Sequence, residues 1–136
     1  RAALEQVWRA GCFSAFNLAQ PVLAAMSARG SGSVIFTGAT ASRRAGAQFA
    51  AFASAKFALR GLAQSLAREY GPKGVHVAHV VLDGLIDEPQ TDARFGPAKS
   101  TRMDPDAIAQ VYLALATQHQ SACTHELDLR PSSERF

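Results

Sequence analysis

The chain has 136 residues, of which 48% are hydrophobic and 18% are charged, a balance typical of one soluble globular domain. The formal net charge is +3, and the arginines are scattered without a dense basic run, which does not favour nucleic-acid binding. No apolar run of about 18 residues free of charge occurs, so a membrane-spanning helix is not predicted.

The two cysteines and the first residues of the chain bear on its cellular compartment and on its length. Cys12 and Cys123 are far apart and lie beside apolar residues, which predicts buried free thiols in a reducing compartment and therefore the cytoplasm. A disulfide between them is the alternative. The chain opens on Arg1 in a stretch that is already helix-like and has no initiator methionine, so we expect further residues upstream.

The first half of the chain predicts two long helices around a short strand. Apolar residues recur at helical spacing over 2–29, with Pro21 inside the pattern, where a kink is expected. The apolar run 33–37 between glycines predicts a buried strand, and the small-residue and basic stretch 38–46 a loop. A second, alanine-rich helix is predicted over about 48–70, ended by a Gly-Pro pair.

The second half predicts two strands separated by a long loop and a helix. The nearly continuous apolar run 75–82 indicates a buried strand of a parallel sheet. The stretch 83–102 has no clear periodicity and predicts a long loop with room for a short helix. Asp104 is a good helix cap, so a helix is expected from there to about Gln118, and the alternating stretch 124–130 predicts a final strand.

This order of elements predicts an α/β fold. Helix, strand, helix, strand, long loop, helix and strand fit a doubly wound parallel sheet with right-handed crossovers. Three strands are few for such a sheet, and its outer edge would present unpaired backbone groups. A longer protein would supply further strands on that edge.

The motifs, in their order and spacing, carry a family resemblance. Five stretches match: GSVIFTG at 32–38, FASAKFAL at 52–59, LAQSLARE at 62–69, GVHVAHV at 74–80 and DGLID at 83–87. They resemble, in turn, the serine-bearing strand, the Tyr-x-x-x-Lys helix and its continuation, the next strand, and the Pro-Gly turn of short-chain dehydrogenases/reductases. The likeness covers nearly the whole chain.

The resemblance implies that residues 1–136 are the C-terminal part of one Rossmann-like domain, with three strands and three helices. The family's nucleotide-binding strands and glycine loop would lie upstream, because no Gly-x-x-x-Gly-x-Gly occurs here. The implied cofactor is NAD or NADP. The residues that read the ribose 2′ position would also lie upstream.

Of the family's four catalytic positions, only the lysine has the expected residue type in this chain. The family's lysine matches Lys56, but Phe52 stands at the tyrosine position four residues earlier. The serine position, thirteen residues before the tyrosine, is Ala39, or Thr40 if the alignment shifts by one. The asparagine position of the preceding helix is Trp8.

This departure has a chemical meaning. In the family the tyrosine exchanges a proton with the substrate oxygen, and the lysine lowers its pKa and holds the nicotinamide ribose. Phenylalanine has no ionisable proton, and acid–base catalysis is typically worth about 10²–10⁴-fold. Tyr70 and Tyr112 do not precede a lysine at the right spacing. The hydroxyls expected nearby are poor acids without assistance: Thr37, Thr40, Ser42 and Ser54.

The resemblance also implies a cofactor-binding set. Lys56 would contact the ribose, while Asp83, Gly84 and Ile86 would form the nicotinamide-side loop, with the Ile86 backbone facing the carboxamide. Asp83 stands where the family has proline and adds a charge near the cofactor. The alternatives are a solvated lysine on a helix and an ordinary turn at the end of a strand.

The sequence does not predict a metal site, but it does predict an oligomer. His76 and His79 are three residues apart on a strand and therefore point to opposite faces, and His125 and Glu126 also point apart. In the family, the two long helices pack against a twofold mate. Small residues on both helices here would allow a homodimer or tetramer.

Three functional hypotheses follow. The first is an NAD(P)-dependent short-chain oxidoreductase with a degenerate active site and an unidentified substrate. The second is a catalytically inactive binding or regulatory protein that keeps the fold, which the residues Phe52, Ala39 and Trp8 favour. The third is a divergent enzyme that needs no tyrosine because its substrate supplies the proton. The fold alone does not choose among them.

Overall fold

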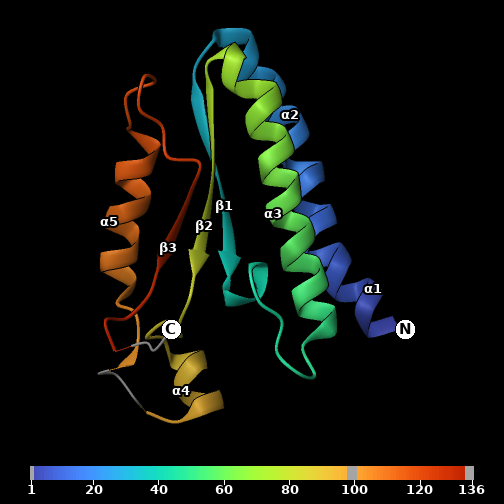
Figure 1. The fold of residues 1–136 in the computed structure, drawn as a ribbon, viewed down its shortest axis with the longest axis vertical. Helices are drawn as coiled ribbons and strands as arrows, with labels where there is room; N and C mark the ends of the chain where they lie inside the picture. The colour runs from blue at the N-terminus through green and yellow to red at the C-terminus, as the bar shows by residue number, and fades with distance from the viewer. Residues whose placement is uncertain (1, 98–100, 134–136) are drawn as a thin grey trace.

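The computed structural model describes residues 2–97 and 101–133 and shows a three-layer α/β arrangement. Three parallel strands form one sheet in the order β1 (Gly32–Ala39), β2 (Val75–Leu82), β3 (Glu126–Leu129). Helices α2 (Ser14–Arg29) and α3 (Ala50–Tyr70) lie side by side on one face, and α5 (Pro105–Ala116) lies on the other (Figure 1). The predicted parallel, doubly covered sheet is confirmed.

The first predicted helix is divided, and not at the expected place. It consists of α1 (Ala2–Trp8), a π-helical turn η1 (Arg9–Phe13) and α2, which runs through Pro21 without a break. The wide turn brings the helix against α3, where a Cβ on Gly11 would lie 3.1 Å from the Cβ of Ala55. Close packing of the two helices therefore accompanies the irregularity, and proline does not cause it.

The other elements follow the sequence closely. Strand β2 has the predicted bounds, β1 continues to Ala39, and β3 is shorter than expected. The long segment after β2 contains a short helix, α4 (Pro89–Phe95), and 3₁₀ turns η2 (Thr40–Ser42) and η3 (Gly71–Lys73) follow β1 and α3. The Asp104 side chain caps α5 by accepting a hydrogen bond from the Asp106 N–H at 2.8 Å.

The core lies between the helix pair and the sheet. Its centre is formed by fully buried residues of α2, α3 and β2, among them Leu23, Ala63 and Val75. Each buried leucine or valine contributes about 1.5–3 kcal/mol to folding. Both cysteines are free thiols; Cys12 is buried, but Cys123 is exposed, so its expected burial is wrong because it lies in the loop before β3.

No helix among the described residues is both long enough and apolar enough to cross a membrane.

Candidate functional site

Lys56 lies in the second turn of α3 and reaches back to the sheet. Its Nζ donates a hydrogen bond to the Thr37 carbonyl at 2.9 Å, near the carboxyl end of β1. The same atom lies 5.8 Å from the centre of the Phe52 ring, because residues four apart share a helix face. Burial lowers the pKa of Lys56. A desolvated ammonium group thus stands beside an aromatic ring that has no hydroxyl.

Ala39 and Trp8, the residues expected at the serine and asparagine positions, carry no catalytic polar group. Ala39 is the last residue of β1, and its N–H donates to the Ser42 hydroxyl at 3.1 Å. Trp8 is the last residue of α1, 41% exposed, and its ring stacks on Phe13 at a centroid distance of 6.2 Å. Phe52 is 40% exposed. These three positions present a largely apolar surface.

The other hydroxyls expected near the site already have partners. Thr37 bonds to Tyr112 of α5 at 2.9 Å, and burial raises the pKa of that tyrosine. The Ser54 hydroxyl donates to the Ala51 carbonyl on α3 itself. Tyr112 is therefore near the same strand residue as Lys56, although no tyrosine–lysine spacing in the sequence indicated it.

Thr40 and Asp83 form a polar pair across the ends of β1 and β2. The Thr40 hydroxyl donates to Asp83 Oδ1 at 2.5 Å, and Asp83 is only 6% exposed. Arg44 and Arg130 place guanidinium groups 3.4 and 3.6 Å from the same carboxylate. The charge that Asp83 brings in place of proline is thus matched by two arginines.

A pocket of about 320 Å³ opens onto this pair. Its wall also carries Arg43 and Asp128, which form an ion pair, and Arg130 bonds to Asp128 at 2.6 Å. The carboxyl ends of all three strands thus contribute charged side chains. Ligands of parallel sheets bind outside these ends. Sequence reasoning found Thr40 and Asp83, and it considered the pair Arg43-Arg44 as a solvated loop tip or a phosphate clamp. It missed Asp128 and Arg130, which the parallel register brings to the same pocket.

The expected cofactor loop has a defined backbone. A Cβ on Gly84 would lie 2.7 Å from the Pro131 side chain, so packing alone requires glycine there. Ile86 forms a parallel bridge with Met103, whose N–H and C=O bond to Leu85 and Asp87. In a parallel bridge the N–H and C=O of the central residue point the other way. The backbone of Ile86 is therefore turned away from Met103.

A buried network lies beneath the site. His79, fully buried, donates from Nδ1 to Glu126 at 2.9 Å, and Arg60 of α3 donates two hydrogen bonds of 2.7 Å to the same carboxylate. Burial lowers the pKa of His79 and outweighs the opposing effect of Glu126. Burial raises the pKa of Glu126, but the bonds from Arg60 and His79 reverse this, and the net pKa is lowered.

The network touches the turn that carries Thr40. His79 Nε2 has no hydrogen-bond partner among the described residues, and a Cβ on Gly38 would lie 2.4 Å from it and 2.7 Å from Ser42 Oγ. The ring thus fills the space that a side chain on Gly38 would need. The signal in the sequence is a histidine inside an apolar strand, which points to a buried polar network as well as to a metal ligand.

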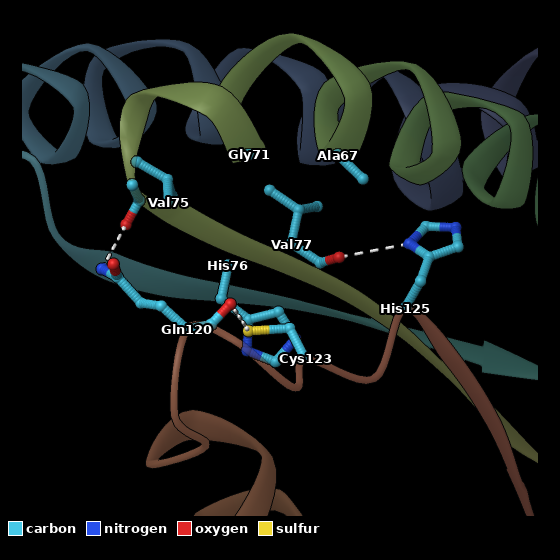
Figure 2. A pocket seen from close by; sticks show the side chains of 9 residues that line it. Ala67, Gly71, Val75, His76, Val77, Gln120, Cys123 and His125 are labelled. Carbon is cyan, nitrogen blue, oxygen red and sulfur yellow. Dashed lines mark hydrogen bonds between the residues drawn. The ribbon is translucent and has the colours of Figure 1, made fainter.

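A second pocket, of about 380 Å³, lies at the amino end of the sheet. Figure 2 shows it between the end of α3 and the segment that carries Gln120 and Cys123. His76 donates to the Thr124 carbonyl at 2.8 Å and His125 to the Val77 carbonyl at 3.2 Å. Among the described residues no group of three or more metal-ligating side chains is placed to hold an ion.

Comparisons with known proteins agree with this arrangement. The short chain dehydrogenase family model matches residues 1–95. A short-chain dehydrogenase from Rhodopseudomonas palustris is 41% identical, with a TM-score of 0.78 over 96% of this chain and 53% of its own. Protein MoaE of Klebsiella aerogenes is 33% identical over 120 residues, which are 88% of this chain and 42% of MoaE.

A more distant structure shows the same fold. An alcohol dehydrogenase from the archaeon Thermococcus sibiricus, solved with 5-hydroxy-NADP, is 20% identical and has a TM-score of 0.80 over 98% of this chain and 55% of its own. The chain therefore spans about half the length of the solved structures it matches, and less than half of the curated relative.

Proposed function

Since the chain belongs to the short-chain dehydrogenase family, we propose that it is the C-terminal part of an NAD(P)-dependent oxidoreductase with an altered active site. The observation that carries the proposal is the placement of Lys56. Its ammonium group is anchored to the Thr37 carbonyl and partly desolvated, beside the position from which the family's tyrosine acts. The substrate is not identified.

The residues present fit a nicotinamide nucleotide. One N–H of Lys56 bonds to Thr37, which leaves donors for ribose hydroxyls, and the backbone of Ile86 is turned to the side away from Met103. Asp83 and Gly84 begin the loop that would run along the nicotinamide. When bound, NAD or NADP would supply the hydride chemistry, and this chain's part is to hold the ribose and the substrate. A cytoplasmic location is part of the proposal.

A catalytically inactive binding or regulatory protein is the second candidate. Phe52 favours it, because Lys56 then has no phenol to activate and its ring contact is a cation–π interaction. Under this alternative the nucleotide would still bind, while no carbonyl or alcohol would be turned over. A gain of turnover in Phe52→Tyr would show that the missing hydroxyl limits the reaction.

We also propose that the protein forms a homodimer or tetramer through α2 and α3. The two helices lie side by side on one face of the sheet (Figure 1). Several exposed large apolar side chains belong to these helices or to the residue directly before one of them. They include Phe13, Phe16, Leu18, Phe49 and Phe57. Light scattering on the full-length protein should give a multiple of the protomer mass, and a clean monomer would contradict this.

The first experiment is titration of the full-length protein with NADH and NADPH. We expect saturable binding of one of them, weakened about tenfold or more in Lys56→Met, because a hydrogen bond from a charged donor is lost. Lys73→Met is the matched control, since Lys73 lies in the exposed turn after α3. Absence of binding in the wild type would exclude the oxidoreductase and the nucleotide-binding alternative together.

A further inference from the structure

The pocket of about 320 Å³ at the carboxyl ends of the strands is lined by charged side chains whose signs alternate. Asp128 contacts Arg43 and accepts a hydrogen bond from Arg130 at 2.6 Å. Asp83 lies 3.6 Å from the same Arg130 and 3.4 Å from Arg44. These residues, the arginine–aspartate series, therefore have a shared cation in the middle and an arginine at each end.

The two arginines at the ends of the series are neighbours in the sequence. The backbone N–H groups of Arg43 and Arg44 both donate to the Thr40 carbonyl, at 3.0 and 3.1 Å, so one tight turn carries both side chains. These side chains are 48% and 54% exposed, whereas that of Arg130 is 18% exposed. The cations that a ligand can reach most easily are therefore the two at the ends of the series.

The series leaves the pocket with an excess of positive charge. Three arginines face two aspartates, so one positive charge remains in excess, and a charged hollow attracts ions of the opposite sign. Within the part of the chain that the structure describes, the Arg43 side chain forms one hydrogen bond, from Nη1 to Asp128. A guanidinium group has five N–H donors, so Arg43 keeps donors for a ligand.

The excess charge and the donor geometry indicate which anion fits the pocket. A carboxylate in contact with Arg43 and Arg44 would neutralise the excess and extend the alternation of signs into a closed ring. Its two oxygens also match the planar fork of a guanidinium group. A phosphate monoester carries about 1.5–2 negative charges near pH 7, which would leave the pocket negative beside Asp83 and Asp128.

We infer that this pocket binds the carboxylate group of a small organic acid between Arg43 and Arg44. Asp83 and Asp128 hold the two arginines in place and disfavour a second negative charge on the ligand. The inference goes beyond the proposed function, because it depends on neither Lys56 nor a nucleotide.

The competing explanation is a clamp without a ligand. Arg43 follows the turn after β1 and Asp128 belongs to β3, so their ion pair links two strand ends, and the rest of the series would only extend that link. A clamp predicts that replacing Arg43 or Arg44 alters stability alone. A binding site predicts a loss of affinity for a carboxylate that a neutral molecule of the same shape does not share.

Ligand-observed NMR on the full-length protein tests the inference with benzoate, benzamide and phenyl phosphate as probes, at low ionic strength because salt screens exposed charges. We expect the wild type to bind benzoate about tenfold or more tightly than benzamide, and more tightly than phenyl phosphate. Arg43→Met and Arg44→Met should each weaken benzoate binding about tenfold, because a charge-assisted hydrogen bond is lost. Arg43→Lys should retain part of the affinity, since it keeps the charge without the fork.

The matched control is Arg68→Met, at an exposed arginine of α3 whose guanidinium donates to the Gln64 carbonyl of the same helix. It should leave benzoate binding unchanged, and so should Lys56→Met, which tests the proposed function. No benzoate binding to the wild type, equal binding of benzoate and benzamide, tighter binding of phenyl phosphate, or an affinity that survives Arg43→Met or Arg44→Met would overturn the inference. Displacement of benzoate by NADPH would also overturn it, because the pocket would then hold the nucleotide's phosphates. A protein that binds NADPH but not benzoate would refute this inference alone.

Discussion

The two ends of the sheet hold polar side chains in different ways. In the pocket at the amino end, His76 and His125 each bond to a backbone carbonyl of a neighbouring segment. Figure 2 shows the bond from His125 to the Val77 carbonyl. In the carboxyl half, Thr40 and Asp83 bond to each other across strands, and Arg60 and His79 meet on one carboxylate. The two histidines thus fix the course of the chain, whereas the four side chains named in the carboxyl half fix one another.

The difference indicates at which end of the sheet side chains hold one another in fixed orientations. Side-chain-to-backbone bonds satisfy buried groups wherever a loop meets a strand. Networks of side chains from several strands hold functional groups in place, at the end of the sheet where ligands bind. The amino-end pocket, of about 380 Å³, is larger than the pocket of about 320 Å³ at Thr40 and Asp83, but only the smaller one lies at the end where parallel sheets bind ligands.

The largest expected effect is at Gly38. A Cβ there would lie 2.4 Å from His79 Nε2, so Gly38→Ala must displace either the buried ring or the turn that carries Thr40. We expect a loss of about 2–3 kcal/mol in the free energy of unfolding, measured by urea denaturation.

The control for this change is Gly61→Ala, in the interior of α3, where an added Cβ meets nothing within 4 Å. Alanine is the better helix former, so we expect a gain of about 0.5–1 kcal/mol. A Gly38→Ala protein as stable as the wild type would show that the His79 ring can move freely, and the carboxyl half would then be no more rigid than the amino end.

Two ion pairs, one beside the middle of β2 and one at the end of α3, should differ next. The side chains of Arg60 and Glu126 are 30% and 22% exposed and form two hydrogen bonds, whereas Lys73 and Glu69 form one exposed contact of 3.7 Å. A double-mutant cycle with Arg60→Met and Glu126→Gln should give a coupling of about 1–2 kcal/mol. The matching cycle with Lys73→Met and Glu69→Gln should give about 0.3–0.5 kcal/mol. Equal coupling energies in the two cycles would show that the two ion pairs do not differ in strength.

The sequence predicted the fold better than it predicted the site, for a physical reason. Strand β2 and helix α3 follow from local periodicity and from their glycine and proline boundaries, which act within a few residues. The pairing of Asp83 with Arg130, or of Arg60 with Glu126, depends on which strands are neighbours and in what register. Nothing local in the sequence carries that information.

The family resemblance had a similar limit. It located Lys56 and the substituted position Phe52, because their four-residue spacing is a property of one helix. It could not show that Thr40 bonds to Asp83, since the family pattern has proline where this chain has Asp83. The π-helical turn before Ser14 was not predicted either, because proline is the stronger helix breaker and placed the expected kink at Pro21 rather than at Gly11.

Stability should depend on pH through the buried network. The folded-state pKa of His79 lies below its usual value of 6.5, so the unfolded chain binds more protons and the folded state is favoured most above that value. Stability should fall as the pH drops below about 6.5, with a slope of at most about 1.4 kcal/mol per pH unit for one proton. Glu126, whose pKa is also lowered, adds a second loss below 4.5.

Urea unfolding of the wild type and His79→Asn between pH 4 and pH 8 measures this dependence. The variant should lose the decline that begins near pH 6.5 and keep the later one. A decline of the same size in His79→Asn would assign it to another group. His125, which lies near His79 and opposes its protonation, is the group to replace next.

The smallest effect is expected at the wall of the amino-end pocket. Gln120 is exposed, and its amide donates to the Gly74 carbonyl over a long 3.4 Å (Figure 2). Gln120→Ala should change the free energy of unfolding by less than about 0.5 kcal/mol, because an exposed and weak bond is replaced by water. It should also leave NADPH binding unchanged. A cost above about 1 kcal/mol, or a changed ligand affinity, would show that side chains at this end support the site through β2, and the division between the two ends of the sheet would have to be abandoned.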